Sequence, residues 1–340
     1  MASLTSLANM LDLRSVRWDI RFPQSMRVRD FDRRARGFTL SYREHGESNS
    51  FRMELDNSDK YFTRNDLFAS GDEISFWLYF AGQPKILMGS FVVDDLDDDD
   101  SQDSGAVVSV EGLAVDCQKT SLKTPKARSF EGSMLSGIVG RVAAENSLEA
   151  VFEGADMLLS RKDQKEQTDL NFLSRLAGDY GFRTRIEGGK LYFLSRKATE
   201  ASGGSGLKIA EYTSSRKFKD QPYRGIKKAQ VKYNDPNKNK LVTAEVESGD
   251  TTVSRENKVT QRVDSPEEAT AVAGAKVNDA KSKQKQCEFN CMATPEMKPP
   301  LNILVEDEGP KWNGLWHIES ADHSYSKQAG YRAVLKGYKL

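Results

Sequence analysis

Alternating hydrophobic and polar positions run through the first third of the chain and predict short β-strands. Turn-rich stretches such as DNSDK and AGQPK separate six of these segments. Because successive side chains of a strand point to opposite faces, each segment can bury one face and expose the other. The pattern is typical of a β-barrel or sandwich, with strands at Val16–Arg21, Gly37–Arg43, Ser50–Leu55, Glu73–Phe80, Ile86–Val93 and Ala106–Val115.

The middle of the chain changes to the three-to-four spacing of amphipathic helices. A stripe that includes Ile138, Val139 and Val142 predicts a helix over Ser133–Asn146. The next regular passage is QTDLNFLSRLAGDYGFRTRIEGGKLYFLSR, residues 167–196, whose first half repeats the helical spacing. We expect the two helices to share one core, because each has an apolar face that must be covered.

The second half of that passage predicts a β-hairpin. Thr168 can cap the start of the preceding helix and Gly181 can end it. Apolar and polar residues then alternate on both sides of Gly188 and Gly189, which can supply the positive φ angles of a tight turn. The passage therefore predicts a compact module of helix, strand, turn and strand.

A change of composition follows this module. The stretch ASGGSG, Ala201–Gly206, predicts a flexible linker. A later helix from Pro266 to about Lys283 begins with a capping box formed by Ser265 and Glu268. Alternating segments predict further strands at Ala229–Asn234, Lys240–Glu247, Gln286–Ala293, Asn302–Glu306, Gly314–Ser320 and Gly330–Leu340.

An internal repeat links the two strand-rich regions. A constant offset of 225 residues superposes three glycines and several apolar positions without a gap. Glycine at equal places between strands implies equal turn geometry, so the repeat indicates a duplicated unit. The pairs are Gly89 with Gly314, Gly105 with Gly330, Gly112 with Gly337, Phe91 with Trp316, Val93 with Ile318, Val110 with Leu335, Leu113 with Tyr338, and Asp94 with Glu319.

These patterns predict an α+β, mainly β fold with two related β-barrels and an inserted module of helices plus a β-hairpin. We predict a first barrel over residues 1–125, the insert over residues 126–200, and a second barrel with one long helix over residues 201–340. A chain of 340 residues with 38% hydrophobic residues is long and apolar enough for two or three domains.

Composition argues against several classes of protein. No apolar run is long enough to span a bilayer, so no membrane anchor is expected. The 50 basic and 50 acidic side chains cancel, so bulk charge gives no support for a nucleic-acid site. The opening residues MASLTSLANMLDLRSVRW lack the pattern of a secretory signal, and assembly in a cytoplasm is therefore expected.

Local charge is nevertheless uneven. Seven aspartates lie between Asp94 and Asp103. Runs of one charge are usually solvated loops or strand edges, but in a symmetric assembly they can set the register between subunits. A run of opposite sign holds Arg27, Arg29, Arg33, Arg34 and Arg36.

One group of residues imitates a zinc site. Its members are Cys287, Cys291, His317 and His323, but their spacing is poor for a zinc finger. On a strand the two thiols would face the same way, so burial in a barrel wall explains them more simply. A third cysteine, Cys117, makes the count odd and implies no disulfide framework.

Another group imitates a calcium loop, but flanking strands and an unusual glutamine favour an acidic hairpin loop. Its members are Asp100, Gln102, Ser104, Gly105 and Glu111. The sequence also lacks a phosphate loop, a nucleophile elbow and an HExxH motif. We therefore predict no catalytic, cofactor-binding or metal-binding residues.

Several passages resemble one protein family. The most specific is KTPKARSFEGSMLSGIVGRVAAENSLEAVF, followed by QTDLNFLSRLAGDYGFRTRIEGGKLYF. Weaker matches are RGFTLSYREHGESNSFRMELDNSDKYF near the start and GLWHIESADHSYSKQAGYRAVLKGY near the end. Together they cover most of the chain and resemble the phage late control D family, the hub proteins of phage tails and related contractile injection systems. That family is similar to the amino-terminal half of the VgrG spike proteins of type VI secretion.

The resemblance implies two barrels per chain and a homotrimer at the tip of the tail tube. A tube is built from rings of six and a spike has three-fold symmetry, so three two-barrel chains would match both. This sequence ends with the second barrel, so a separate spike protein is expected. The implied role is a structural adapter in the virion tail baseplate, with the tube protein, the spike protein, and tape-measure and other baseplate proteins as partners.

The alternative function is a tail-associated enzyme that degrades peptidoglycan. A glycosidase needs an acid in an apolar pocket and a second carboxylate at a fixed separation. No glutamate of this sequence has a strongly apolar context, except in strands where the period of two turns it outward. We therefore predict a protein that is not an enzyme.

Overall fold

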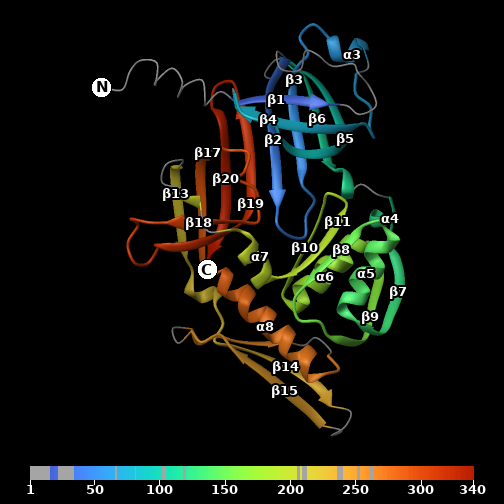
Figure 1. Cartoon of the computed structure of the whole chain (residues 1–340), viewed down its shortest axis with the longest axis vertical. Coiled ribbons are helices and arrows are strands. Elements are labelled where there is room, and N and C mark those ends of the chain that lie inside the picture. The colour runs from blue at the N-terminus through green and yellow to red at the C-terminus, as the bar shows by residue number, and fades with distance from the viewer. Residues whose placement is uncertain are drawn as a thin grey trace.

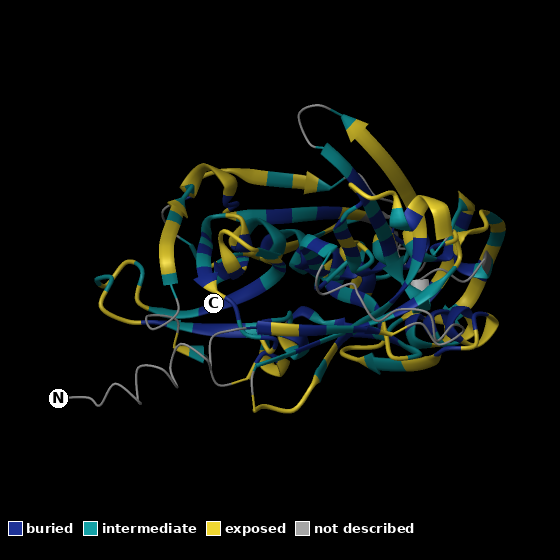
Figure 2. Cartoon of the chain, turned by 90° about the horizontal axis from the view of Figure 1, so that it is seen from above, coloured by how far each residue is buried: buried dark blue, intermediate teal, exposed yellow. Residues whose placement is uncertain are grey.

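The computed structural model describes residues 16–21, 34–65, 67–80, 82–101, 105–117, 120–204, 207–208, 213–235, 240–250, 253–259 and 263–340. Figure 1 shows strands of the first third at the top, strands of the last quarter on the left, and helices with small sheets below and to the right. Buried positions, dark blue in Figure 2, lie mainly along the inner strands, and exposed positions gather on the outer strands and loops.

The first barrel region contains six strands, and we call it the first half. They are β1 (Val16–Arg21), β2 (Ala35–Arg43), β3 (Ser50–Asp56), β4 (Glu73–Phe80), β5 (Ile86–Ser101) and β6 (Gly105–Ala114), with the short helix α3 (Tyr61–Asn65) after β3. The second half consists of β12 (Leu207–Lys208), β13 (Thr213–Asp220), β17 (Lys285–Met292), β18 (Leu301–Val305), β19 (Gly314–Ser326) and β20 (Gly330–Lys339).

One sheet of twelve strands contains both halves. Its order is β1-β4-β5-β6-β3-β2-β19-β20-β17-β13, with β18 beside β19 and β12 beside β18. Strands β2 and β19 pair antiparallel and join the halves. The mainly β fold class is confirmed, and the two barrels form halves of a continuous sheet.

The sheet contains one four-strand unit twice. The first unit is β5-β6-β3-β2 and the second is β19-β20-β17-β13. All ten pairs of the β5–β6 ladder recur in the β19–β20 ladder at an offset of 225 residues, and each ladder skips one residue, Asp94 or Glu319. The β2–β3 ladder skips Arg36, and the β13–β17 ladder skips Ser214. These two skipped residues are 178 positions apart, as are the paired residues of β2 and β13. Because β-bulges are specific local features, their coincidence confirms the predicted repeat.

The two halves share one hydrophobic core. Phe91 and Trp316 occupy equivalent places on β5 and β19, and their exposed fractions are 1% and 0%. At the joint, the rings of Phe38 and Tyr325 stack with centroids 5.6 Å apart, and Trp18 meets Tyr325 edge-on at 4.5 Å. The joint between the halves is therefore an apolar contact as well as a backbone ladder.

Between the halves, the chain forms an α/β module. Its elements are η1 (Val115–Cys117), α4 (Thr120–Lys123), β7 (Lys126–Met134), α5 (Leu135–Glu145), β8 (Glu149–Glu153), β9 (Leu158–Gln167), α6 (Asp169–Tyr180), β10 (Phe182–Glu187), β11 (Lys190–Ser195) and α7 (Arg196–Ser202). The Thr168 side chain accepts a hydrogen bond from the Asn171 amide at 3.2 Å, and Gly181 ends α6 with a φ of 76°. The predicted helix and hairpin are thus confirmed.

A further lobe contains η2 (Pro222–Arg224), β14 (Lys228–Asp235), β15 (Lys240–Glu247), β16 (Glu256–Val259) and α8 (Pro266–Ser282). Its apolar residues belong to the same core cluster as those of the α/β module. The Tyr180 hydroxyl donates to Glu268 Oε1 at 2.8 Å, and Lys162 Nζ lies 2.6 Å from the same oxygen. The long helix therefore packs on the module at residues 126–200, although we grouped it with the second barrel. The domain boundaries at 125 and 200 stay a prediction.

The predicted linker Ala201–Gly206 is wrong for its first four residues. Ala201 and Ser202 belong to α7, and Gly203 O accepts a hydrogen bond from Asn302 N at 2.9 Å. The Asn302 side-chain amide also donates to Gly204 O at 3.0 Å. This end of the stretch is therefore fixed to β18, while residues 205–206 lie outside the described residues.

The aspartate run lies on a strand rather than in a hairpin loop. Strand β5 continues to Ser101, and its residues Asp94–Asp100 are all exposed. Gln102, Asp103 and Ser104 lie outside the described residues. In the arginine run, Arg34 pairs with Asp59 at 2.7 Å and Arg36 with Asp56 at 3.1 Å, whereas Arg27, Arg29 and Arg33 lie outside the described residues.

The repeat predicts a specific need for glycine beside each bulge. A Cβ at Gly337 would lie 1.9 Å from His317 O, and one at Gly112 would lie 2.6 Å from Val92 O. Gly337→Ala should therefore lower the free energy of unfolding by roughly 2 kcal/mol or more. The control is Gly140→Ala, because no atom lies within 4 Å of a Cβ at this helical site. Chemical denaturation measures both, and a Gly337→Ala variant as stable as the control would contradict the packing.

Candidate functional site: the polar junction and the open strand edges

A polar cleft lies where the two halves meet the α/β module and α8. Its volume is about 670 Å³, and most of the residues that line it are charged. They come from the end of β2, from α6, β10, α7, α8, β19 and β20: Arg43, Glu44, His45, Glu47, Arg175, Asp179, Arg183, Arg196, Lys276, Asp279, Glu319, Asp322 and Lys336. We call this group the polar junction, because it contacts every part of the fold.

A buried chain of hydrogen bonds forms its floor. Glu44 follows β2, and its Oε1 lies 2.6 Å from Nε2 of His317 on β19. The other ring nitrogen, Nδ1, lies 2.7 Å from Asn302 Oδ1. Asn302 uses its amide group to donate to Glu200 O at 2.8 Å, so its oxygen faces the ring. Each ring nitrogen of His317 is therefore held by a side-chain oxygen.

Arg183 of β10 connects the α/β module to both halves. Its guanidinium lies 3.7 Å from Glu44 Oε2 and 3.1 Å from Glu319 Oε1. Partial burial raises the pKa of Glu319, and the charge of Arg183 opposes that rise. Beside them, His45 Nδ1 accepts a hydrogen bond from Thr184 N at 3.0 Å. Burial and the positive charge of Arg183 lower the pKa of His45 to about 4, so the ring is neutral at pH 7.

Arg196 connects α7 to α8 and to the last strand. Its Nη1 donates to Asn278 O at 2.7 Å, and its guanidinium lies 5.4 Å from the ring centroid of Tyr338. The Tyr338 hydroxyl donates to Glu200 Oε1 at 2.7 Å. The polar junction thus joins four structural parts through ion pairs, hydrogen bonds and a cation–π contact.

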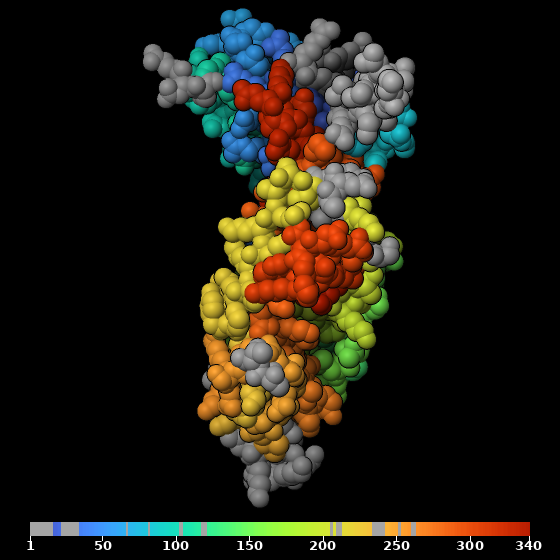
Figure 3. Space-filling view, turned by 90° about the vertical axis from the view of Figure 1, so that its left-hand side faces the viewer, coloured from blue at the N-terminus to red at the C-terminus, as the bar shows by residue number. Residues whose placement is uncertain are grey.

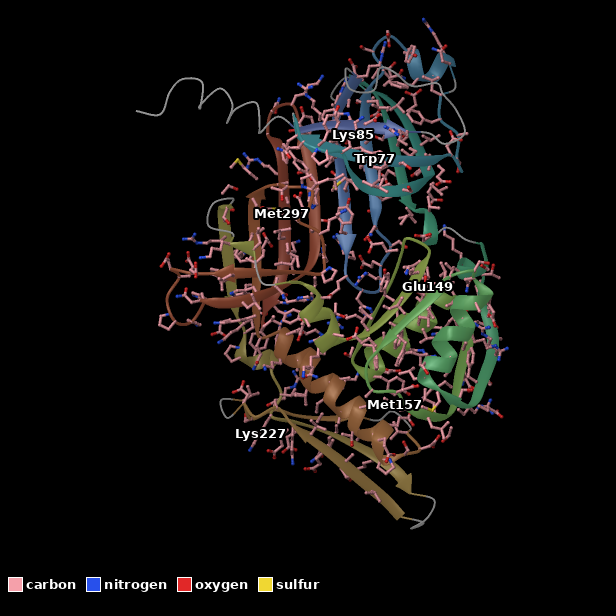
Figure 4. The ribbon with its side chains drawn as sticks, in the orientation of Figure 1. Trp77, Lys85, Glu149, Met157, Lys227 and Met297 are labelled. Atoms are coloured by element: carbon pink, nitrogen blue, oxygen red, sulfur yellow. The ribbon has the colours of Figure 1, made fainter. Side chains whose placement is uncertain are left out.

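The four zinc candidates do not come together. Cys287 and Cys291 are buried with Phe289 on one face of β17, which confirms the predicted orientation. His317 binds Glu44 and Asn302, while His323 Nε2 lies 2.8 Å from Met297 O and its Nδ1 lies 2.7 Å from the Tyr331 hydroxyl. Figure 4 labels Met297 beside the strands of the second half. Among the described residues, no three potential ligands are close enough to hold a metal ion.

The calcium-loop candidates are also separated. Asp100 pairs with Ala106 in the β5–β6 ladder, and Glu111 lies opposite Asp95. Asp100 Oδ2 is 3.5 Å from Lys60 Nζ. Gln102 and Ser104 lie outside the described residues. The described part of this group is thus a strand surface with charged neighbours, not a loop that converges on one point.

Several strands of the main sheet pair on one edge only with strands that the structure describes. Among these strands, β1 pairs with β4 alone, and β13 pairs with β17 alone. Beyond Val93, the described partner of β5 is β6. In Figure 1, β13 lies on the left and β5 on the right, and Figure 3 shows the left side, where the yellow and red surface of the second half is exposed. Lys85, labelled in Figure 4, forms an ion pair with Asp19 of β1 at 2.7 Å.

Within the described parts of the chain, no helix is long and apolar enough to cross a bilayer. Sequence reasoning missed Glu44, Arg183 and Arg196 as junction residues. Glu44 and Arg196 have polar neighbours in sequence and Arg183 lies on an alternating strand, and only the tertiary fold brings the three together. His317 and His323 were noted only as zinc candidates.

Two curated relatives are named as probable baseplate hub proteins. The relative from Escherichia phage 186 is 26% identical over 196 residues, which are 56% of this chain and 48% of the relative. The relative from Escherichia phage P2 is 28% identical over 195 residues, which are 57% of this chain and 48% of the relative. The chain spans about half the length of the curated relatives it matches. No protein-family model matches the chain.

Solved structures share the fold along nearly the whole chain. A 43 kDa tail protein of prophage MuSo2 from Shewanella oneidensis has a TM-score of 0.72 at 16% identity, and the match covers 96% of this chain and 98% of that one. A tail protein from Neisseria meningitidis has a TM-score of 0.69 at 12% identity, with 96% of both chains covered. The chain is similar to phage tail hub proteins.

A further match extends this similarity to type VI secretion. An Escherichia coli component of that system, described as structurally similar to tail proteins of bacteriophage T4, has a TM-score of 0.60 at 12% identity. The match covers 95% of this chain and 77% of that one. The resemblance to hub and VgrG-like proteins that we noted in the sequence is therefore confirmed.

The contacts of Arg183 in the polar junction predict that Arg183→Met lowers the free energy of unfolding strongly. This change would leave Glu44 Oε2, which has no hydrogen-bond partner, without its nearby cation. Breaking a buried charge pair costs roughly 3 to 5 kcal/mol of the free energy of unfolding. The control is Lys190→Met, because Lys190 and Glu149 form an exposed pair at 3.0 Å that solvent screens, so its loss should change stability little. Equal denaturation midpoints for the two variants would contradict the role of Arg183.

His323 predicts a loss of stability in acid. Burial lowers its pKa to about 4, although the hydrogen bond with Met297 O partly opposes that shift. Between the ordinary value of 6.5 and about 4, the unfolded state binds more protons than the folded state. As the pH falls from 6.5 to 4, the free energy of unfolding should therefore decrease, by roughly 3 kcal/mol from His323 alone. Urea denaturation from pH 7 to pH 4 measures this slope, which should be shallower for His323→Gln. An unchanged slope would contradict the assignment.

Proposed function

We propose that the chain is a structural hub protein of a phage tail or a related contractile injection system. The observation that carries this proposal is the duplicated four-strand unit, with ten equivalent pairs in its central ladder and a bulge at the same place in each copy. The similarity to probable baseplate hub proteins and to solved tail proteins supports a structural role in the tail. The location is then the virion, at the baseplate, after assembly in the host cytoplasm.

The duplication suggests how such a hub could match two symmetries. One chain presents two similar four-strand units within a rigid frame, so three chains would present six. Six similar surfaces suit a tube built from rings of six, while three identical chains suit a three-fold spike. We therefore propose a homotrimer that contacts the tube protein and a spike protein, with tape-measure and other baseplate proteins as further partners.

The trimer can be measured directly. Mass determination of the purified full chain over a range of concentrations, alone and with tube protein, should give a species of three copies. A monomer at low concentration would agree with the proposal, because mass action favours the assembly at higher concentration. A dimer or a six-copy ring as the final species would contradict it.

The polar junction also permits a test of the alternative function. Glu319 is the acid of the cleft whose pKa is raised, so it is the best candidate for a general acid. Its neighbours are paired charges rather than an apolar pocket. We therefore expect no clearing of purified peptidoglycan in a turbidity assay. Clearing that disappears in Glu319→Gln would support a peptidoglycan-degrading enzyme instead.

A further inference from the structure

Two open strand edges correspond to the two edges that join inside the chain. Strand β13 holds the place in the second four-strand unit that β2 holds in the first, and its one described strand partner is β17 on its inner edge. The residues Asp95–Ser101 of β5 correspond to Ser320–Ser326 of β19 at the offset of 225. Inside the chain, β2 pairs with this part of β19. No described strand pairs with the corresponding edge of β5.

The internal joint therefore supplies a register for the two open edges. Phe38, Thr39 and Ser41 of β2 lie opposite Tyr325, Ser324 and Asp322 of β19. In the repeated ladders, each residue of β5 corresponds to the residue of β19 whose number is 225 higher. Each residue of β2 corresponds to the residue of β13 whose number is 178 higher. If β13 and β5 pair in the register of β2 and β19, five pairs of residues face each other. They are Asp100 with Arg216, Asp99 with Lys217, Asp98 with Phe218, Asp97 with Lys219, and Leu96 with Asp220.

Three of these five pairs bring an aspartate opposite a basic residue, although charge played no part in the alignment. Asp97, Lys217 and Lys219 are exposed, and within the described residues none of their side chains has an ion-pair or hydrogen-bond partner. Opposite charges directly across an antiparallel pair stabilise it, and like charges destabilise it. The two edges are thus complementary to each other in charge, and no described strand of the same chain pairs with either of them.

We propose that β13 of one copy pairs antiparallel with the Leu96–Asp100 part of β5 in the next copy. This contact rests on the proposed trimer and identifies the surface that builds it. It is a head-to-tail contact, because different edges meet, and such contacts form a ring when the rotation closes. The main sheet would then continue from one chain to the next through copies of the β2–β19 joint.

The internal β2–β19 joint also indicates where the ladder between copies should end. A Cβ at Gly37 of β2 would lie 2.6 Å from Tyr325 O, so the internal joint needs glycine there. The corresponding residue of β13 is Ser215. The ladder between copies should therefore extend from Arg216 to Asp220 and end before Ser215.

Engineered cysteines test the register in the full chain. Asp97→Cys together with Lys219→Cys should form disulfide-linked oligomers under mild oxidation, because directly opposite strand residues are close enough for a disulfide. The matched control is Asp95→Cys together with Lys219→Cys, which is out of register by two residues. The background should contain Cys117→Ser, and the other two native cysteines are buried. Linked species are read on a non-reducing gel.

Charge reversal tests the energetics of the same pair. Asp97→Lys alone and Lys219→Asp alone should each raise the concentration for half-assembly by roughly tenfold, because like charges would then face each other. The double variant should assemble as the unmodified chain does. Circular dichroism should show that all the variants are folded.

The outcomes separate this proposal from the proposed function. In-register linkage with rescue by the double variant supports the strand contact. A trimer that forms without in-register linkage, and that tolerates both single reversals, overturns the strand contact and leaves the hub trimer in place. A chain that forms no trimer at any concentration, alone or with tube protein, overturns the trimer and the contact together.

Discussion

The antiparallel pairing of β2 with β19 is the interaction on which the rest of the structure depends. It joins two copies of one four-strand unit through a backbone ladder between residues that are far apart in the sequence. Arg43 seals one end of the ladder by an ion pair with Asp322 at 2.7 Å, and the Tyr42 hydroxyl donates to Met88 O at 2.9 Å. Because the ladder ends at Arg43, it also places Glu44 in the polar junction.

The polar junction extends this constraint to the rest of the chain. Buried charges are costly unless each has a partner, so the ion pairs at Arg183 and Glu44 fix how the α/β module meets both halves. A hub that transmits load between a tube and a spike needs a fixed angle between its parts. The proposed role therefore accounts for the paired charges where the four parts meet.

Local patterns predicted much of the fold. The glycine spacing identified the repeat because Gly112 and Gly337 are required where each bulge brings a carbonyl oxygen close. The ribbon of β7 and β9 was not predicted, because most of its residues are polar and its pattern has no clear apolar face. The extension of β5 was also missed, since aspartate is rare in strands, yet here Val107, Val108 and Val110 of β6 pair with the acidic stretch.

The candidate site could not be predicted in the same way. Glu44, Arg183 and His317 are separated by more than a hundred residues, and each follows the strand alternation of its own segment. Alternation shows that a side chain points away from the core of its own sheet. It does not show that another part of the fold buries that side chain. The open edges were equally hidden, because an edge strand and a central strand can have the same pattern.

The central claim is that one chain supplies two equivalent units to a ring built by three chains. Electron microscopy of the tail tip with bound tube, averaged without imposed symmetry, tests this claim most directly. The account predicts six similar β-units around the axis, contributed alternately by the first and second halves of three chains. Six copies of the chain, or a ring in which only one half of each chain faces the tube, would contradict it.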